Sequence, residues 1–229
     1  MSDQDSVLLL VGSAKQQGSS TSESLGNYLC ERLADHGYTA KTMHVHSALR
    51  TEQRVQRLLE AVDDAELIVL AVPLYVDSLP YLVTQALERI AAHRNETAVH
   101  SVRAPRFVAV INCGFPEAHH NDVALAICRQ FAANAGLVWA GGLSLGGGGF
   151  VGGVPLEQRG RSAQGIRRAL ELSATSLAAG SAVPQEAAEL IAKPVIPARL
   201  YATVGDIGWH VTAWRQGIHR HLYDRPFEI

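Results

Sequence analysis

A cluster of hydroxyl side chains follows the first apolar segment of the chain. Residues 7–11 read VLLLV, Gly12 ends this run, and six serines and threonines lie within residues 13–24. Hydroxyl groups and the free N–H groups at the start of a helix both donate hydrogen bonds to anions. The sequence therefore predicts a phosphate-binding loop, in which the donors are Ser13, Lys15, Ser20, Thr21 and Ser22.

The spacing of this loop excludes two common nucleotide motifs. Gly12 and Gly18 are six residues apart and Ser19 follows, whereas a Walker loop requires GxxxxGK[ST]. The GxGxxG pattern of dinucleotide-binding folds is absent as well. A phosphate bound mainly by hydroxyls is more typical of a held cofactor than of a phosphoryl donor. A structural alternative is that Ser20 and Glu23 form only a helix capping box.

The elements that would position this loop alternate between strand and helix. Short apolar runs are typical of strands covered on both faces, whereas an alternating run indicates a strand nearer an edge. The expected strands are 7–11, 38–45, 66–72, 106–111 and 137–145. Helical periodicity marks the segments between them, namely 25–33, 52–63, 79–90, 124–135 and 158–179. We therefore expect an α/β fold, a three-layer, doubly wound, five-stranded parallel sheet.

Composition narrows the class of protein. The 229 residues are 47% hydrophobic and 18% charged, as in an ordinary globular chain, and the net charge of −2 does not favour a nucleic-acid partner. No apolar run is long enough to span a membrane, and the polar start MSDQDS does not resemble a signal peptide. Three widely separated cysteines suit a reducing compartment, so we expect a cytoplasmic protein.

Three segments resemble the flavin loops of the flavodoxin-like, NAD(P)H-dependent FMN reductases. They read GSAKQQGSSTSESL (12–25), PLYVDSLPYLVTQALERI (73–90) and INCGFPEAHHNDVALAICRQFAANAG (111–136). The resemblance covers residues 7–150, and it departs from the family at Ala14, where proline is common. It implies a flavodoxin-like fold with FMN as the cofactor and NAD(P)H as the hydride donor.

The resemblance also assigns roles to the second and third loops. The second loop would lie along the flavin ring through Pro73, Leu74, Tyr75, Val76, Asp77 and Ser78. The third would meet the pyrimidine edge of the ring through Asn112, Cys113, Gly114, Phe115 and Glu117. Cys113 is expected to pack as a small apolar residue and not to act as a nucleophile. No catalytic acid or base is predicted, because the flavin carries the redox chemistry.

Two function classes fit these loops. The first is an enzyme that passes hydride from NAD(P)H through FMN to a quinone, flavin or other small acceptor. The second is a flavodoxin-type electron-transfer protein without an organic substrate of its own. Shuttles of that type use a strongly acidic surface to meet their partners, and the small net charge favours the enzyme. A homodimer or higher homo-oligomer is expected.

The remaining features of the sequence leave alternatives open. Residues 146–168 are glycine-rich and then basic, which suits either a mobile loop or a flap over the flavin, with arginines that meet a nucleotide phosphate. Histidine pairs such as His119 and His120 lack metal-ligand spacing, so no metal is expected. The predicted FMN-binding domain spans residues 1–183, and residues 184–229 form a C-terminal helical extension that packs on the domain or on a partner subunit.

Overall fold

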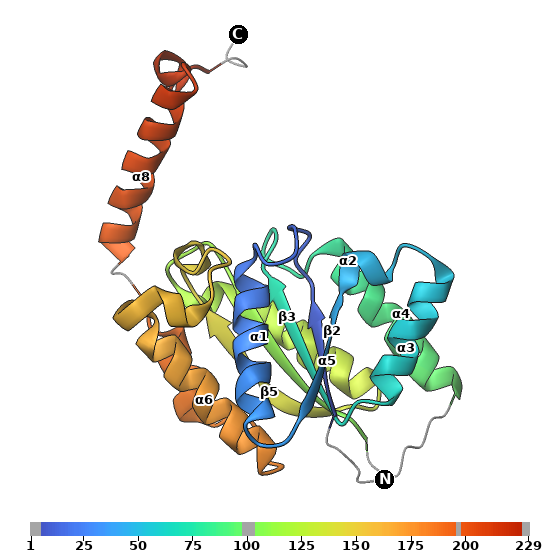
Figure 1. Ribbon diagram of the computed structural model, residues 1–229. Helices are drawn as coiled ribbons and strands as arrows, with labels where there is room; N and C mark the ends of the chain where they lie inside the picture. Colours follow the sequence, from blue (N-terminus) through green and yellow to red (C-terminus); the bar gives the residue numbers. More distant parts are fainter. Residues whose placement is uncertain (1–5, 98–103, 196–197, 226–229) are drawn as a thin grey trace. The chain divides into compact units, whose positions relative to one another are not determined.

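The computed structural model describes residues 6–97, 104–195 and 198–225 (Figure 1). The chain divides into two compact units, Met1–Val195 and Ile196–Ile229. The first unit holds the sheet and the predicted cofactor loops, and the second is helical. The two units are described separately.

The first unit is built on a parallel sheet of five strands in the order β2-β1-β3-β4-β5. The strands are β1 (Ser6–Val11), β2 (Thr39–His44), β3 (Leu67–Pro73), β4 (Arg106–Asn112) and β5 (Val138–Leu145). This confirms the predicted α/β class, and the order is the flavodoxin-like one, in which the chain reverses direction across the sheet between β1 and β3.

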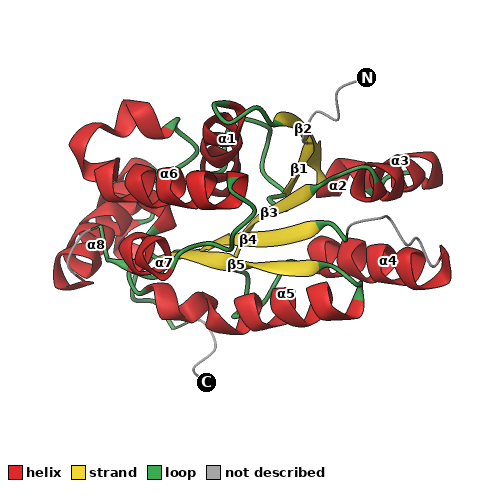
Figure 2. Ribbon diagram, turned by 90° about the horizontal axis from the view of Figure 1, so that it is seen from below, coloured by secondary structure: helices red, strands yellow, loops and turns green. Residues whose placement is uncertain are grey.

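Helices cover both faces of the sheet, as Figure 2 shows. Leu9 of β1 points to a core that contains α1 (Thr21–Ala34), α6 (Gln164–Ala178) and α7 (Gln185–Ala192). Leu8 points to the opposite core, which contains the other four α-helices described in this unit, namely α2 (Val45–Ala48), α3 (Glu52–Asp63), α4 (Tyr81–Thr97) and α5 (Asp122–Asn134). The sequences of β1, β3 and β4 are almost continuously apolar because successive side chains enter different cores, whereas the edge strand β2 is largely exposed.

The fifth helix begins later than its periodicity predicts. The expected helix spans 158–179, but residues Leu156–Ala163 form an irregular 3-10 segment, and α6 begins at Gln164. Gly160 interrupts the segment because its φ of 60° and ψ of −143° do not fit a helix. The arginine-rich part of this segment is therefore loop-like.

The compact unit extends beyond the domain boundary expected at residue 183. Ala187 and Ile191 of α7 are fully buried in the same core as α1 and α6. The second unit therefore begins at Ile196, and α7 belongs with the sheet.

The second unit contains α8 (Ala198–Arg215) and a short 3-10 turn, His219–His221. Trp209 and Trp214 of α8 are largely exposed within this structure, whereas Ala213 is buried. Over the parts of the chain that the structure describes, no helix combines the length and the apolar character needed to cross a membrane.

Candidate functional site

A cleft opens at the carboxyl ends of β1, β3 and β4. Its volume is about 270 Å³. Loops that are far apart in the sequence form its walls, and the lining residues are Ser13, Lys15, Ser20, Thr21, Ser22, Pro73, Leu74, Tyr75, Asn112, Cys113, Gly114, Gly148, Gly149 and Gly152. In a sheet of this type, ligands bind at the reversal point of the strand order, which is where this cleft lies.

Gly12 lets the first loop leave the sheet in a confined space. Its N–H donates to the carbonyl of Ala71 at 2.9 Å, and a Cβ at this position would lie 2.4 Å from Val72 Cγ1 and 2.5 Å from Val83 Cγ2. A larger residue would force β1 away from β3 and α4. The glycine that ends the apolar run is therefore needed to seat the loop at the edge of the cleft.

The capping prediction for Ser20 is correct, but the box is not reciprocal. Ser20 has extended backbone angles, and its Oγ accepts from the N–H of Glu23 at 3.2 Å. The carboxylate of Glu23 accepts instead from the N–H of Gly18 at 2.7 Å, and Glu23 is not among the residues that line the cleft. Glu23 thus closes the loop without placing its negative charge in the cleft wall.

Thr21 and Ser22 connect α1 to two other walls of the cleft. Thr21 Oγ1 donates to the carbonyl of Gly148 at 2.7 Å, and Ser22 Oγ donates to Oδ1 of Asn112 at 2.7 Å. Within the described chain, the backbone N–H groups of Thr21 and Ser22 have no backbone acceptor. These N–H groups, at the positive end of α1, are free to bind an anion.

The second predicted loop enters the cleft only in part. Pro73, Leu74 and Tyr75 line it, but Val76, Asp77 and Ser78 do not. Tyr75 and Ser78 exchange two backbone hydrogen bonds, at 2.9 and 3.1 Å, around a tight two-residue turn.

This turn holds two residues in a rare conformation. Val76 and Asp77 have φ values of 49° and 57°, in the left-handed region that favours glycine. For a β-branched residue such as Val76 that conformation is a true outlier, and the side chain is 98% exposed. Strain of this kind is concentrated at functional sites.

The third predicted loop divides in the same way. Asn112, Cys113 and Gly114 line the cleft, whereas Phe115 and Glu117 lie beyond it. Burial raises the pKa of the Cys113 thiol, and its Sγ lies 3.4 Å from the carbonyl of Phe115. Cys113 is only 3% exposed and protonated at neutral pH, which agrees with packing and not with nucleophilic attack.

One wall of the cleft is formed by Gly148, Gly149 and Gly152. Their sequence favoured either a mobile loop or a flap over the flavin, and none of the three was named as a cofactor-binding residue. The glycine run at 146–149 was the available signal. A Cβ on Gly153 would lie 2.3 Å from the backbone carbon of Ser19, so only glycine permits this approach to the first loop. Residues 146–153, which we call the glycine loop, therefore pack directly on the predicted phosphate loop.

In the flap alternative, the arginines that would meet a nucleotide phosphate are Arg159, Arg161, Arg167 and Arg168. Two of them hold the backbone near the glycine loop. Arg159 donates through Nε to the carbonyl of Val151 at 3.0 Å. Arg167 donates through Nη1 to the carbonyls of Leu156 and Gly160 at 2.8 and 2.9 Å. Nη1 of Arg168 lies 3.8 Å from Oε2 of Glu171. None of the four predicted arginines lines the cleft, the fourth being Arg161.

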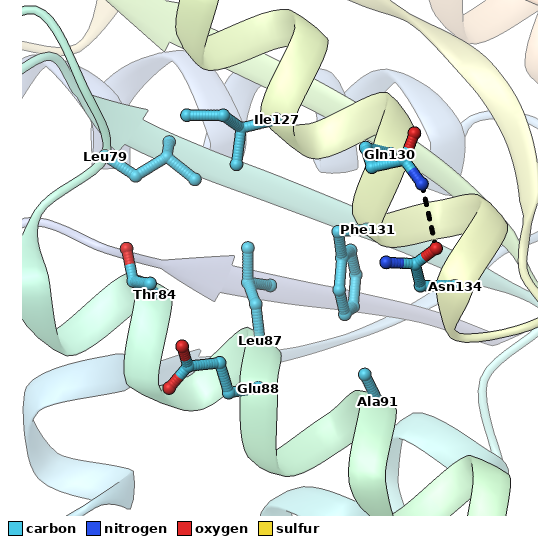
Figure 3. A pocket seen from close by; sticks show the side chains of 9 residues that line it. All are labelled: Leu79, Thr84, Leu87, Glu88, Ala91, Ile127, Gln130, Phe131 and Asn134. Atoms are coloured by element: carbon cyan, nitrogen blue, oxygen red, sulfur yellow. Dashed lines mark hydrogen bonds between the residues drawn. The ribbon is translucent and has the colours of Figure 1, made fainter.

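A second hollow lies between α4 and α5, and it shares no lining residue with the cleft (Figure 3). Its volume is about 260 Å³. Leu79, Leu87, Ile127 and Phe131 give it an apolar wall, and Gln130 and Asn134 hydrogen-bond to each other at 2.8 Å along one side. Its polar lining residues are Thr84, Glu88, Gln130 and Asn134, and no lysine or arginine is among them to bind a phosphate.

Comparison with solved structures identifies the fold. A NADH:FMN oxidoreductase in its apo form superposes with a TM-score of 0.53 at 12% identity, covering 84% of this chain and 96% of that one. A NAD(P)H:quinone oxidoreductase from Methanothermobacter marburgensis gives 0.52 at 13% identity, covering 72% and 94%. An FMN-dependent NADH-azoreductase from Bacillus anthracis, in complex with FMN, gives 0.50 at 14% identity, covering 76% and 100%.

These similarities confirm the flavodoxin-like fold that the sequence resemblance implied. No protein-family model matches the sequence, and a search of curated proteins finds no significant match. At such low identity the shared fold does not carry the chemistry across, so function must be argued from the cleft itself.

Proposed function

We propose that this chain is an FMN-dependent oxidoreductase that passes hydride from NAD(P)H to a quinone, flavin or other small acceptor. The observation that carries the proposal is the cleft at the strand-order reversal. The cleft offers anion donors at the start of α1 and, at the carboxyl ends of β3 and β4, an open backbone surface at Gly114 beside Tyr75. These are the two requirements of a cofactor that has a phosphate at one end and a flat ring at the other.

The inner end of the cleft fits a phosphate. The N–H groups of Thr21 and Ser22 are free, Ser13 and Ser20 line the wall, and Lys15 adds a positive charge. The carboxylate of Glu23 is held by the N–H of Gly18. We infer that the phosphate binds at the start of α1, mainly through backbone N–H groups.

The outer end of the cleft fits a flat ring. Nothing lies within 4 Å of a Cβ built on Gly114, so this backbone is open to a ligand on that side. Tyr75 offers an aromatic surface from the second loop. That loop lies beside the third one, because the Leu74 N–H donates to the Asn112 carbonyl at 2.8 Å. When bound, the flavin would supply the hydride chemistry, and these residues would bind and orient its ring.

The protein's electrostatics suit this role. Cys113 is neutral, so it places no thiolate beside the ring. The backbone amides of the second and third loops are fixed dipoles that can stabilise negative charge on a reduced ring. We further propose that the protein works in the cytoplasm as a homodimer or higher homo-oligomer and that FMN is bound by the first unit.

The test is spectroscopic and kinetic. The purified full-length chain, incubated with FMN and then desalted, should show a flavin spectrum that bleaches anaerobically with NADH or NADPH. It should also oxidise NAD(P)H steadily when menadione is supplied. Flavin binding without NAD(P)H oxidation would instead identify an electron-transfer protein, and failure to bind FMN would contradict both assignments.

A further inference from the structure

Three aromatic rings form a stack immediately beyond the cleft. The ring centroids of Phe115 and His120 are 4.4 Å apart with planes tilted by 33°, and those of His120 and His119 are 4.5 Å apart with planes at 28°. Phe115 follows Gly114, which lines the cleft, yet it is 53% exposed itself. The stack therefore begins where the predicted cofactor surface ends.

The backbone under the stack is held by hydrogen bonds from β5 and from the glycine loop. Gly147 N–H donates to the carbonyl of Phe115 at 2.6 Å, and Ser144 Oγ donates to the carbonyl of Ala118 at 2.6 Å. Asn121 is fully buried, and its Nδ2 donates to Ser144 Oγ at 2.9 Å. An exposed aromatic group on a fixed backbone is already ordered for binding, which lowers the entropy cost of binding.

The neighbouring glycine loop makes this arrangement specific. A Cβ on Gly146 would lie 2.1 Å from the carbonyl oxygen of Pro116, so the loop that carries Phe115 packs against a position that only glycine can occupy. Glu117 Oε2 lies 3.8 Å from Nε2 of His120, which places an acceptor beside one edge of the stack. The rings are thus oriented by contacts on both sides.

We propose that the rings of Phe115, His119 and His120 form the binding surface for the planar aromatic electron acceptor. This inference rests on the proposed function and adds the residues that select the acceptor. Because Phe115 and His119 both stack on His120, the faces left for a flat ring are those of Phe115 and His119 that point away from it, and the imidazole N–H groups can donate to its carbonyl oxygens. None of the three residues lines the cofactor cleft, so the surface serves a second molecule.

The experiment compares wild type with Phe115→Leu and His119→Leu, both loaded with FMN. Menadione is the planar acceptor, and ferricyanide is an acceptor with no aromatic face. Val123→Ala is the matched control, because Val123 is 58% exposed at the start of α5 and lies outside the stack. Binding of menadione to the oxidised protein, followed by the flavin spectrum without NAD(P)H, gives a readout independent of turnover.

The proposal predicts that each leucine variant raises the dissociation constant and KM of menadione by about 2- to 13-fold, the range that one aromatic pair contributes. The KM of ferricyanide and the FMN dissociation constant should stay within about twofold of wild type, as should every parameter of Val123→Ala. The melting temperature of each variant is measured to check that it is folded.

Three results would overturn the proposal. Unchanged menadione binding in both leucine variants would make the stack a surface feature. An equal rise in KM for menadione and ferricyanide would show no selection for flat rings. A rise in the FMN dissociation constant would make the stack part of the cofactor site. A wild-type chain that does not bind FMN would remove the proposed function itself, and that result is distinct from the other three.

Discussion

The inner and outer halves of the site are built in opposite ways. In the inner half, Thr21 and Ser22 are buried, and their hydroxyls tie α1 to the glycine loop and to β4. In the outer half, Val76 and Phe115 are exposed, and Val76 is held in a strained turn. Buried residues whose side chains are fixed and whose N–H groups are free suit a ligand that stays bound, whereas an exposed rim suits molecules that come and go.

Because the two halves are built differently, substitutions in them should affect FMN binding differently. Changes in the inner half should alter the FMN dissociation constant, and changes in the outer half should leave that constant nearly untouched.

Gly153→Ala should cause the largest loss of FMN affinity. The new Cβ would lie 2.3 Å from the backbone of Ser19, and the φ of 81° is unfavourable for alanine. Overpacking of this kind costs about 1–3 kcal/mol, so the FMN dissociation constant should rise by roughly 5- to 150-fold. The measurement is quenching of flavin fluorescence as the variant is added.

Gly160→Ala provides the control for Gly153→Ala. Gly160 has a φ of 60°, but a Cβ there meets nothing within 4 Å. It carries the same kind of backbone strain without touching the first loop, so FMN affinity should be near wild type. If both variants lose affinity equally, the strain and not the contact between the loops is responsible.

Thr21→Val should weaken FMN binding less than Gly153→Ala. Valine keeps the shape but leaves the carbonyl of Gly148 without the hydrogen bond at 2.7 Å. An unsatisfied buried acceptor costs about 1–3 kcal/mol. We expect part of this cost to lower the free energy of unfolding of the apoprotein and the rest to weaken FMN binding.

Ser24→Ala is the control for Thr21→Val. Its Oγ donates to the carbonyl of Ser20 at 3.2 Å, and it does not line the cleft. FMN titration and thermal unfolding of the apoprotein should show a change in affinity for Thr21→Val only. A loss of stability in Thr21→Val with unchanged FMN affinity would mean that this hydroxyl only holds the fold together.

Val76→Gly should stabilise the apoprotein while it leaves FMN affinity nearly unchanged. Removing a β-branched residue from a φ of 49° relieves about 1 kcal/mol of strain, partly offset by the extra freedom of glycine in the unfolded chain. Val76→Asn, which tolerates this conformation and keeps a side chain, should behave similarly. Urea unfolding measures the first effect, and a clear rise in the FMN dissociation constant of either variant would place Val76 in the cofactor site.

Lys15→Ala should have the smallest effect. Lys15 lines the cleft but is exposed, and solvent reduces a charge pair to about 0–1 kcal/mol. The loss in FMN affinity should shrink further at high salt. Lys41→Ala, an exposed lysine on β2, is the control, and a large loss from Lys15→Ala would show that the phosphate relies on this charge.

The sequence predicted the sheet well because its three central strands, β1, β3 and β4, are apolar almost throughout. Residues 7–11 and 106–111 lie within one residue of the observed β1 and β4. The late start of α6 could not be predicted from periodicity, because the left-handed φ of Gly160 depends on local backbone geometry.

The candidate site could be predicted where consecutive residues carry it. The hydroxyls after Gly12 predicted the first loop, and the family resemblance predicted Pro73 to Tyr75 and Asn112 to Gly114 as lining residues. The wall formed by Gly148 was not assigned, because glycine carries no side-chain chemistry and its role depends on its distance from Thr21 in space. Val76 and Phe115 were assigned to the cofactor from their neighbours in sequence, whereas the structure places them outside the cleft lining.

One titration tests the central claim that the start of α1 binds the phosphate of a held cofactor. Wild-type apoprotein is titrated with FMN and with riboflavin, which lacks the phosphate, under identical conditions of salt and pH. We predict that FMN binds at least about tenfold more tightly, because hydrogen bonds to a charged group contribute about 1.5–3 kcal/mol each. Equal affinity for the two flavins would contradict a phosphate site at Thr21 and Ser22, and no binding of either would contradict the flavoprotein assignment.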